Sequence, residues 1–308
     1  MSYNNILDYI WNTPLIRINK LNPNPENVNL LAKVEWFNPT WSIKDRVAMN
    51  MVEKAEKEWK LNKGKTIIEA TSGNTGIWLA MIGACKWYSV EIVMSEAVSI
   101  ERMHMIQAFW AKITLTDWKL WTDWAIKKAR EKITKNPEKY FMPDQFSNEN
   151  NKLTHYHKTW KEIWKQTRWK ITHFVSSIWT SGTIMWVGSY LKEQNSNIKI
   201  ICAHPTKWHY IQWLKNMQEA IVPSIYDPSK IDETIMIETN KAYEITRKIV
   251  ENEGIFVGMS SWAAMYAAIK IAEQINKECN IVVIFPDRWE KYLTTNLFEL
   301  KDKSKLTK

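Results

Sequence analysis

The first candidate for chemistry is a lysine set among polar residues. Lys44 lies in the segment NPTWSIKDR (38–46), between a serine and an Asp-Arg pair, directly before a helical pattern at 47–60. Most lysines are charged surface residues, and that interpretation stays open for any single one of them. A lysine held among polar groups at a helix start can instead act as an amine nucleophile that forms a Schiff base. Lys44 alone indicates such chemistry only weakly.

Two turns rich in hydroxyl groups and glycine follow strand-like runs. TSGNTG (71–76) follows TIIEA (66–70), and TSGT (180–183) follows HFVSSI (173–178), each directly before a helical pattern. Such turns present backbone N–H groups and hydroxyls at a helix N-terminus, where a carboxylate or phosphate binds well. Ordinary helix capping is a credible explanation for either turn alone. Two such turns and Lys44 in one chain are harder to explain by capping.

No metal site is expected. The six histidines are scattered, and the sequence contains no HExxH and no Cys/His cluster. His155 and His157 share a helical stretch and are expected to be surface or packing residues. GMSSW (258–262) begins a further helix, with capping again the simple explanation. GxSxG, Walker A and GxGxxG motifs are absent.

Alternating strands and helices must position these segments. Strands alternating with helices predict an α/β fold, with parallel sheets covered by helices on both faces. The predicted strands are 66–70, 90–94, 112–116, 173–178, 198–204 and 280–287. The predicted helices are 47–60, the segment from the 71–76 turn through Ile82, 99–109, 121–135, 150–166, 183–194, 240–252 and 261–277.

Length and composition fit a globular protein. A chain of 308 residues predicts two compact domains or one large one, with a core that needs no disulfide or metal. No apolar run reaches the roughly 18 residues of a membrane helix, and the N-terminus lacks the pattern of a signal peptide. The three cysteines, Cys85, Cys202 and Cys279, form no CxxC motif and favour a reducing, cytoplasmic location.

The net charge of +9 comes mostly from lysine. A basic chain can bind nucleic acid, but no zinc spacing, RNP-like strand or Arg-rich arm accompanies the charge here. We therefore expect a solvated lysine surface that modestly favours the approach of anionic substrates, and no nucleic-acid or membrane partner.

In this order, the motifs resemble the cysteine synthase (O-acetylserine sulfhydrylase) family of fold-type II pyridoxal-phosphate enzymes. The resemblance runs from NTPLIRI (12–18) to EKYLTT (290–295). DQFSNENN (144–151) and ITHFVSSIWTSGT (171–183) are similar to the B-type isozyme, whereas IQWLKNM (211–217) is closer to other branches. The resemblance implies two three-layer αβα domains, similar to tryptophan synthase β, with the active site in the cleft between them.

The family pattern also implies domain limits and site residues. Residues 1–45 and 150–308 would form the larger, cofactor-binding domain, and residues 46–149 a smaller, mobile substrate-binding domain. Lys44 would bond the cofactor and later carry protons. The other cofactor contacts would be Asn74, Trp179, Thr180, Ser181, Gly182, Thr183 and Ser260. The substrate carboxylate would contact Thr71, Ser72, Asn74, Thr75 and Gln145.

The implied reaction is a pyridoxal 5′-phosphate-dependent β-replacement. O-Acetylserine would lose acetate to give an α-aminoacrylate, and sulfide or thiosulfate would then add to form L-cysteine. Alternatives are an O-phosphoserine sulfhydrylase, a cystathionine β-synthase-like enzyme, a serine/threonine dehydratase, or a catalytically dead scaffold. The family also implies a homodimer and a possible complex with serine acetyltransferase.

Tryptophan departs from this pattern throughout the chain. The sequence has 19 Trp and 8 Gly, whereas about 7% of residues, roughly 20 here, are normally glycine. All tryptophans except Trp164 stand where the family has glycine, for example Trp11, Trp41 and Trp179. We hypothesise that UGA codons meant as glycine were translated as tryptophan. If the indoles are real, we expect poor folding and weak cofactor binding, because indoles at 41 and 179 would crowd the cofactor.

Overall fold

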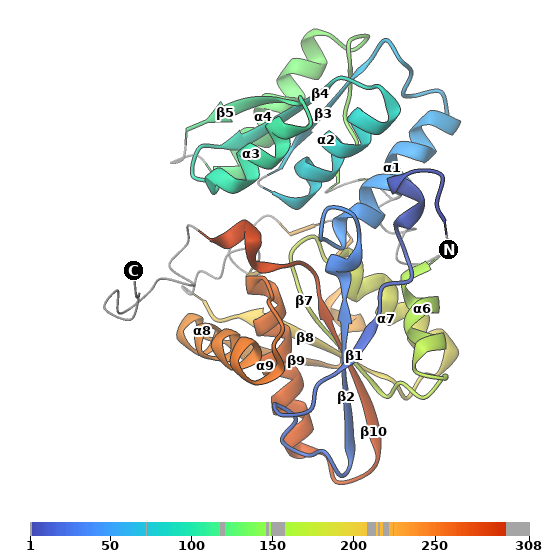
Figure 1. Cartoon of the computed structure of the whole chain (residues 1–308), viewed down its shortest axis with the longest axis vertical. Coiled ribbons are helices and arrows are strands. Elements are labelled where there is room, and N and C mark those ends of the chain that lie inside the picture. The colour runs from blue at the N-terminus through green and yellow to red at the C-terminus, as the bar shows by residue number, and fades with distance from the viewer. Residues whose placement is uncertain are drawn as a thin grey trace.

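A computed structural model shows two sheets, each covered by helices on both faces (Figure 1). The described residues are 2–71, 73–117, 121–145, 148, 158–207, 214, 216, 217, 222, 223 and 225–293. We call the six-stranded sheet with α6–α9 the large-sheet half, and the four-stranded sheet with α1–α4 the small-sheet half. The predicted α/β class with mostly parallel sheets is confirmed; the domain limits stay a prediction.

The strands of the large sheet run in the order β1-β2-β10-β7-β8-β9, and only β1 is antiparallel to its neighbour. They are β1 (Leu15–Arg17), β2 (Val28–Val34), β7 (His173–Ser177), β8 (Lys199–Pro205), β9 (Glu233–Ile237) and β10 (Cys279–Phe285). The helices of this half are α6 (Trp160–Gln166), α7 (Gly182–Gln194), α8 (Thr239–Lys248) and α9 (Met259–Gln274).

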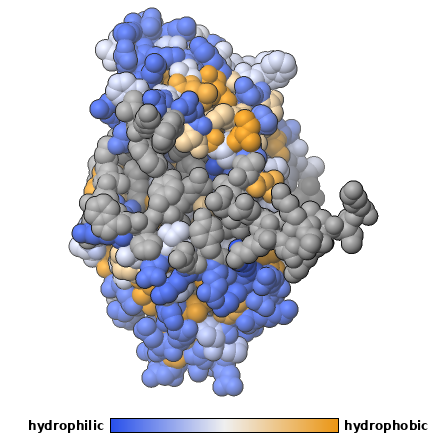
Figure 2. Space-filling model, turned by 90° about the vertical axis from the view of Figure 1, so that its left-hand side faces the viewer, coloured by the Kyte–Doolittle hydropathy of each residue, from blue (hydrophilic) through white to orange (hydrophobic). Residues whose placement is uncertain are grey.

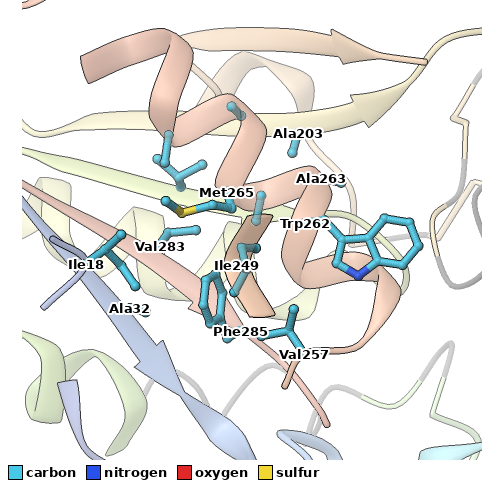
Figure 3. Close-up of a cluster of buried hydrophobic side chains, with 14 of the residues drawn as sticks. Ile18, Ala32, Ala203, Ile249, Val257, Trp262, Ala263, Met265, Val283 and Phe285 are labelled. Atoms are coloured by element: carbon cyan, nitrogen blue, oxygen red, sulfur yellow. The ribbon is translucent and has the colours of Figure 1, made fainter. Parts of the chain in front are cut away.

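Strand β10 shows how the large sheet serves two cores. Ile281, Val283 and Phe285 face the cluster formed with α8 and α9, part of which Figure 3 shows. Val282 and Ile284 face the opposite cluster, formed with α6 and α7. Since successive side chains of a strand point to opposite faces, a sheet buried on both sides requires an uninterrupted apolar run, as here.

The small sheet has four parallel strands in the order β5-β4-β3-β6. They are β3 (Thr66–Ala70), β4 (Val90–Ser95), β5 (Lys112–Thr116) and β6 (Tyr140–Phe141). One face packs against α1 (Lys44–Lys57), α2 (Asn74–Lys86) and α3 (Ile100–Ala108), and the other packs against α4 (Trp121–Lys135).

The chain crosses between the two halves at the start of α1. Ile43 is buried in the core of the large-sheet half, whereas Val47 is buried in the core of the small-sheet half. Lys44 lies between them, at the crossing.

Most predicted elements match the structure. The strands 66–70 and 112–116 and the helix 121–135 have the predicted limits. Four strands were missed, namely β1, β2, β6 and β9. The predicted helix 150–166 is described only from residue 158, and α6 begins at Trp160. His155 and His157 lie outside the described residues.

Several tryptophans have left-handed backbone conformations, which bulky residues rarely adopt. The φ angles are 100° at Trp11, 59° at Trp41, 58° at Trp59, 59° at Trp87, 61° at Trp110 and 63° at Trp169. In these positions a Cβ atom crowds the backbone, and glycine is the usual residue.

The two halves differ in surface hydropathy. On the face shown in Figure 2, hydrophilic residues cover most of the large-sheet half, and hydrophobic residues gather on the small-sheet half. None of the described helices is long and apolar enough to cross a membrane.

Candidate active site

A pocket of about 700 Å³, counted to its open mouth, lies where the two halves meet. Its walls come from the starts of α1, α2, α7 and α9 and from the carboxyl ends of β7 and β10, where α/β proteins usually bind ligands. The sequence-predicted site residues in its lining are Lys44, Thr71, Asn74, Thr75, Gln145, Trp179, Thr180, Ser181, Gly182, Thr183 and Ser260. Ser72 lies outside the described residues. The roles of these residues stay predictions.

Lys44 is the first residue of α1, and its side chain is partly buried in the pocket. Burial lowers the pKa of Lys44 to about 8 by disfavouring the ammonium form, and the nearby Asp287 carboxylate partly opposes this effect. More of the amine is therefore unprotonated near neutral pH than in an ordinary lysine. A nucleophile or a proton carrier needs this property.

The turn before α2 supplies hydroxyl and amide groups. Thr75 Oγ1 donates a hydrogen bond to Gln145 Oε1 at 2.7 Å, and both side chains are buried. Asn74 Nδ2 donates to Asp287 Oδ2 at 2.7 Å, whereas the buried Asn74 Oδ1 accepts no hydrogen bond from the described residues. Among the described residues, no side chain caps the N-terminus of α2. The turn therefore offers polar groups to a ligand.

The turn before α7 is built in a similar way. Ser181 precedes the helix with a left-handed backbone, at φ 60°, and its Oγ donates to the carbonyl oxygen of Thr180 at 2.7 Å. The Ser181 side chain therefore does not cap α7. The N-terminus of a 13-residue helix carries a partial positive charge, so an anionic group suits this wall of the pocket.

Sequence reasoning missed Asp287 as a site residue. It follows β10, lines the pocket, and accepts a hydrogen bond from the hydroxyl of Tyr292 at Oδ2 over 2.8 Å. Its backbone oxygen accepts from the N–H of Gly258 at 3.0 Å. The available signal was an acidic residue at the carboxyl end of a predicted parallel strand. Ser176 and Ser177, at the end of β7, also line the pocket and were missed in the same way.

A buried ion cluster holds α1 in place beside the pocket. Arg46 Nε lies 2.6 Å from Glu35 Oε2, and Arg46 Nη1 lies 2.6 Å from Glu162 Oε1. Lys33 Nζ lies 2.7 Å from Glu162 Oε2. The cluster ties the first turn of α1 to β2 and α6 of the large-sheet half. It therefore fixes Arg46, which is two residues after Lys44.

The loop that leads to Lys44 is braced from the other side. The buried Lys291 donates to the carbonyl oxygens of Thr40 at 3.0 Å and Trp41 at 3.1 Å. Asp45 accepts a hydrogen bond from the Thr40 N–H at 2.6 Å, so its carboxylate is used within the loop.

The pocket residues fit pyridoxal phosphate. Lys44 supplies an amine for the aldehyde, and the uncapped start of α7 supplies N–H groups for a phosphate. The unfilled Asn74 Oδ1 and the hydroxyl of Ser260 supply polar contacts for the ring. The indole of Trp179 lines the same wall as the α7 turn. Among the described side chains, no group of three or more His, Cys, Asp or Glu residues could hold a metal ion.

The pocket between the two mostly parallel sheets holds a lysine amine and the starts of two helices that no described side chain caps. These features define an α/β enzyme whose lysine amine reacts with a carbonyl group. The family comparison identifies it further. The model of the pyridoxal-phosphate dependent enzymes matches residues 6–287, and the chain belongs to this family.

Relatives and solved structures agree with this assignment. The chain is 46% identical to a cysteine synthase of Aquifex aeolicus, over 96% of this chain and 93% of the relative. It is 37% identical to cysteine synthase B of Pseudomonas aeruginosa, over 97% and 99%. The crystal structure of a cysteine synthase from Entamoeba histolytica superposes with a TM-score of 0.92 at 39% identity, over 98% of this chain and 93% of that one.

Proposed function

We propose that this protein is a pyridoxal-phosphate-dependent cysteine synthase that makes L-cysteine from O-acetylserine and sulfide or thiosulfate. The observation that carries the proposal is the Lys44 amine, which lines one pocket together with the turns before α2 and α7. Near-full-length similarity to cysteine synthases supports the choice of reaction.

The proposed roles follow from the chemistry of each wall. Thr71, Thr75 and Gln145, with Ser72 and Asn74, bind the substrate carboxylate near the start of α2. The Lys44 amine removes the proton from the substrate Cα, because its lowered pKa of about 8 leaves a useful fraction unprotonated. Pyridoxal phosphate, when bound, withdraws electrons from that carbon and so makes the proton removable.

The cofactor is held by the opposite wall. Residues 179–183 would hold the phosphate at the start of α7, and Asn74 would offer its amide to the 3′-oxygen of the ring. Ser260, at the start of α9, would offer its hydroxyl to the pyridine nitrogen. A neutral hydroxyl there does not enforce protonation of the ring as a carboxylate would, which suits β-elimination better than transamination.

Spectral titration and product analysis test the proposal. Adding pyridoxal phosphate should give a new near-visible absorbance band that shifts on adding O-acetylserine, and sulfide should then yield L-cysteine. Lys44→Ala should abolish the band and the product, whereas Lys270→Ala, which removes an exposed lysine of α9, should abolish neither.

The substrate series separates the alternatives. Turnover of O-phosphoserine in place of O-acetylserine indicates an O-phosphoserine sulfhydrylase. Formation of a keto acid from serine or threonine indicates a dehydratase, and formation of cystathionine indicates a cystathionine β-synthase-like enzyme. A protein with no spectral change and no product is a scaffold, which would overturn the proposal.

We also propose the domain limits and assembly that the family implies. Residues 46–149 form a smaller substrate-binding domain, and residues 1–45 and 150–308 form the cofactor-binding domain. The protein acts as a homodimer in the cytoplasm and is a candidate partner of serine acetyltransferase. The free cysteines, with Cys85 exposed, fit a reducing compartment. Light scattering with and without the acetyltransferase tests the assembly.

A further inference from the structure

We propose that Asp287 is a positioning residue: its carboxylate orients the Asn74 amide and places a negative charge beside the Lys44 amine. This inference rests on the proposed function, because Asn74 and Lys44 matter together only where the cofactor binds. It concerns a residue that comes from the large-sheet half, whereas Asn74 begins a helix of the small-sheet half.

Two hydrogen bonds to one oxygen hold the Asp287 carboxylate, whereas the buried Oδ1 accepts none from the described residues. Oδ2 accepts hydrogen bonds from Asn74 Nδ2 at 2.7 Å and from the Tyr292 hydroxyl at 2.8 Å. Asp287 is buried, and a Cβ atom at Gly258 would lie only 2.0 Å from Oδ1. The absence of a side chain at Gly258 therefore leaves the room that this carboxylate occupies.

The bond to Asp287 also sets the direction of the Asn74 side chain. Because Oδ2 takes one hydrogen of the Asn74 amide, the group cannot flip without losing a charge-assisted hydrogen bond. The amide therefore offers its remaining N–H and its unfilled Oδ1 in a fixed orientation. A ligand that contacts Asn74 meets an amide that is already oriented.

The charge of Asp287 acts on Lys44. Among the described pocket-lining residues, these two are the charged ones, and the Asp287 charge favours the ammonium form against the effect of burial. Other charged groups lie behind Asp287: its charge acts on Lys291, and that of Arg102 on the Tyr292 hydroxyl beside it. Asp45, adjacent to Lys44 in sequence, hydrogen-bonds within the preceding loop.

The test measures the Lys44 amine in cofactor-free protein, where enzymatic activity plays no part. The pH dependence of Lys44 acetylation by acetic anhydride is followed by peptide mass spectrometry. Asp287→Asn should lower the pKa of Lys44 by about one unit, the size expected for losing one close opposite charge. Tyr292→Phe keeps the charge and should leave the pKa nearly unchanged. Asp232→Asn, which removes a carboxylate paired with Lys192 away from the pocket, is the matched control.

A second measurement reads the orientation of Asn74. Pyridoxine 5′-phosphate has the ring oxygen and the phosphate but no aldehyde, so its affinity does not depend on Lys44 bonding. Asp287→Asn should weaken its binding about tenfold. If Asp287→Asn does not fold, the smaller neutral Asp287→Ser replaces it, with the same expectations. An unchanged or raised pKa of Lys44, or unchanged affinity, overturns the proposal. Failure of cysteine synthesis with these shifts present overturns only the proposed function.

A second inference adds the backbone conformation to the sequence pattern: we infer that the natural polypeptide carries glycine at every tryptophan position except Trp164. Four helices, α1, α2, α3 and α6, are followed within three residues by a tryptophan in the left-handed conformation. Glycine is the usual residue there, because it ends a helix without a Cβ clash. These four are Trp59, Trp87, Trp110 and Trp169.

The environments of the indoles support the same conclusion. Trp59, Trp87 and Trp110 are 87%, 86% and 95% exposed, so their large apolar rings gain nothing from burial. Trp78 is fully buried in α2, yet its Nε1 has no hydrogen-bond partner among the described residues. A buried unpaired donor costs about 1–3 kcal/mol. The ring therefore gains little at the three exposed positions, and its buried donor at Trp78 costs free energy.

The gene and the native protein decide the matter. The codons at these positions should be UGA, and the codon for Trp164 should be UGG. Protein purified from its source cells should be about 2.3 kDa lighter than 36.5 kDa, because glycine lacks the whole side chain. UGG codons at the other positions, or a native mass of 36.5 kDa, overturn the inference.

Discussion

Arg46 Nη1 lies 2.6 Å from Glu162 Oε1, and this buried ion pair joins the helix that begins with Lys44 to α6 of the other half. Lys33 and Glu35 complete the cluster. Since three of these side chains are fully buried and Glu162 nearly so, removal of one charge leaves its partners uncompensated.

Glu162→Gln should lower the free energy of unfolding by about 3–5 kcal/mol at neutral pH. Urea denaturation measures this value. Glu244→Gln is the control, because Glu244 pairs with Lys248 on the exposed surface and such pairs contribute about 0–1 kcal/mol. Equal effects of the two substitutions would contradict a structural role for the cluster.

The same cluster predicts an acid dependence. Burial by itself raises the pKa of Glu162, but hydrogen bonds and charges from Arg46 and Lys33 outweigh burial and hold the pKa at about 2. A lowered carboxyl pKa stabilises the fold above its ordinary value of 4.5, and the contribution is lost as pH falls towards 2. The stability difference between wild type and Glu162→Gln should therefore shrink over this range.

Glu69 predicts the opposite dependence. Burial in β3 and the charge of the Asp144 carboxylate together raise its pKa to about 8, against hydrogen bonds from the backbone. The folded state then keeps a proton that the unfolded state releases above 4.5, so stability falls as pH rises from about 4.5 to 8. Glu69→Gln should remove this fall, as denaturation at several pH values would show. An unaltered pH profile in the variant contradicts the assignment.

Trp110 allows a test of backbone strain in the protein that carries the tryptophans. Trp110→Gly should raise the free energy of unfolding by about 1–2 kcal/mol, because glycine has no Cβ atom to clash with the backbone in the left-handed conformation. Trp110→Ala removes the indole but keeps the Cβ, so it should give little of this gain. Thermal denaturation of the two variants separates strain from ring exposure, and equal gains would refute the role of the backbone.

Thr75 is expected to act in substrate binding. Thr75→Val keeps the shape but removes the donor to Gln145, which should raise the KM for O-acetylserine about tenfold with a smaller change in kcat. Thr134→Val removes a hydroxyl that donates to a backbone oxygen on the surface of α4, and serves as the control. A KM equal to that of wild type would place the carboxylate elsewhere.

The fold was predictable where the local pattern was strong. Strand β4 is buried along its whole length and forms an apolar run, and β5 alternates polar with apolar residues, so both carry a strand pattern. Strand β1 has only three residues, and β9 exposes most of its side chains, so neither carries a strand-like pattern. Their strand conformation depends on pairing with β2 and β8, which lie elsewhere in the sequence.

The candidate site was predictable to a similar degree. Lys44 and the two turns are local motifs, and their order along the chain resembles one family. The contact of Asp287 with Asn74 spans 213 residues and arises only when the two halves meet. No local spacing predicts such a bond.

The backbone passes from one core to the other between Ile43 and Val47, with Lys44 at this crossing. If the small-sheet half swings about this point, the α2 turn sweeps through an arc while the reactive nitrogen, close to the axis, barely moves. Closing the pocket to water would then leave the side-chain nitrogen of Lys44 in place, and this is the atom whose position matters most for the reaction.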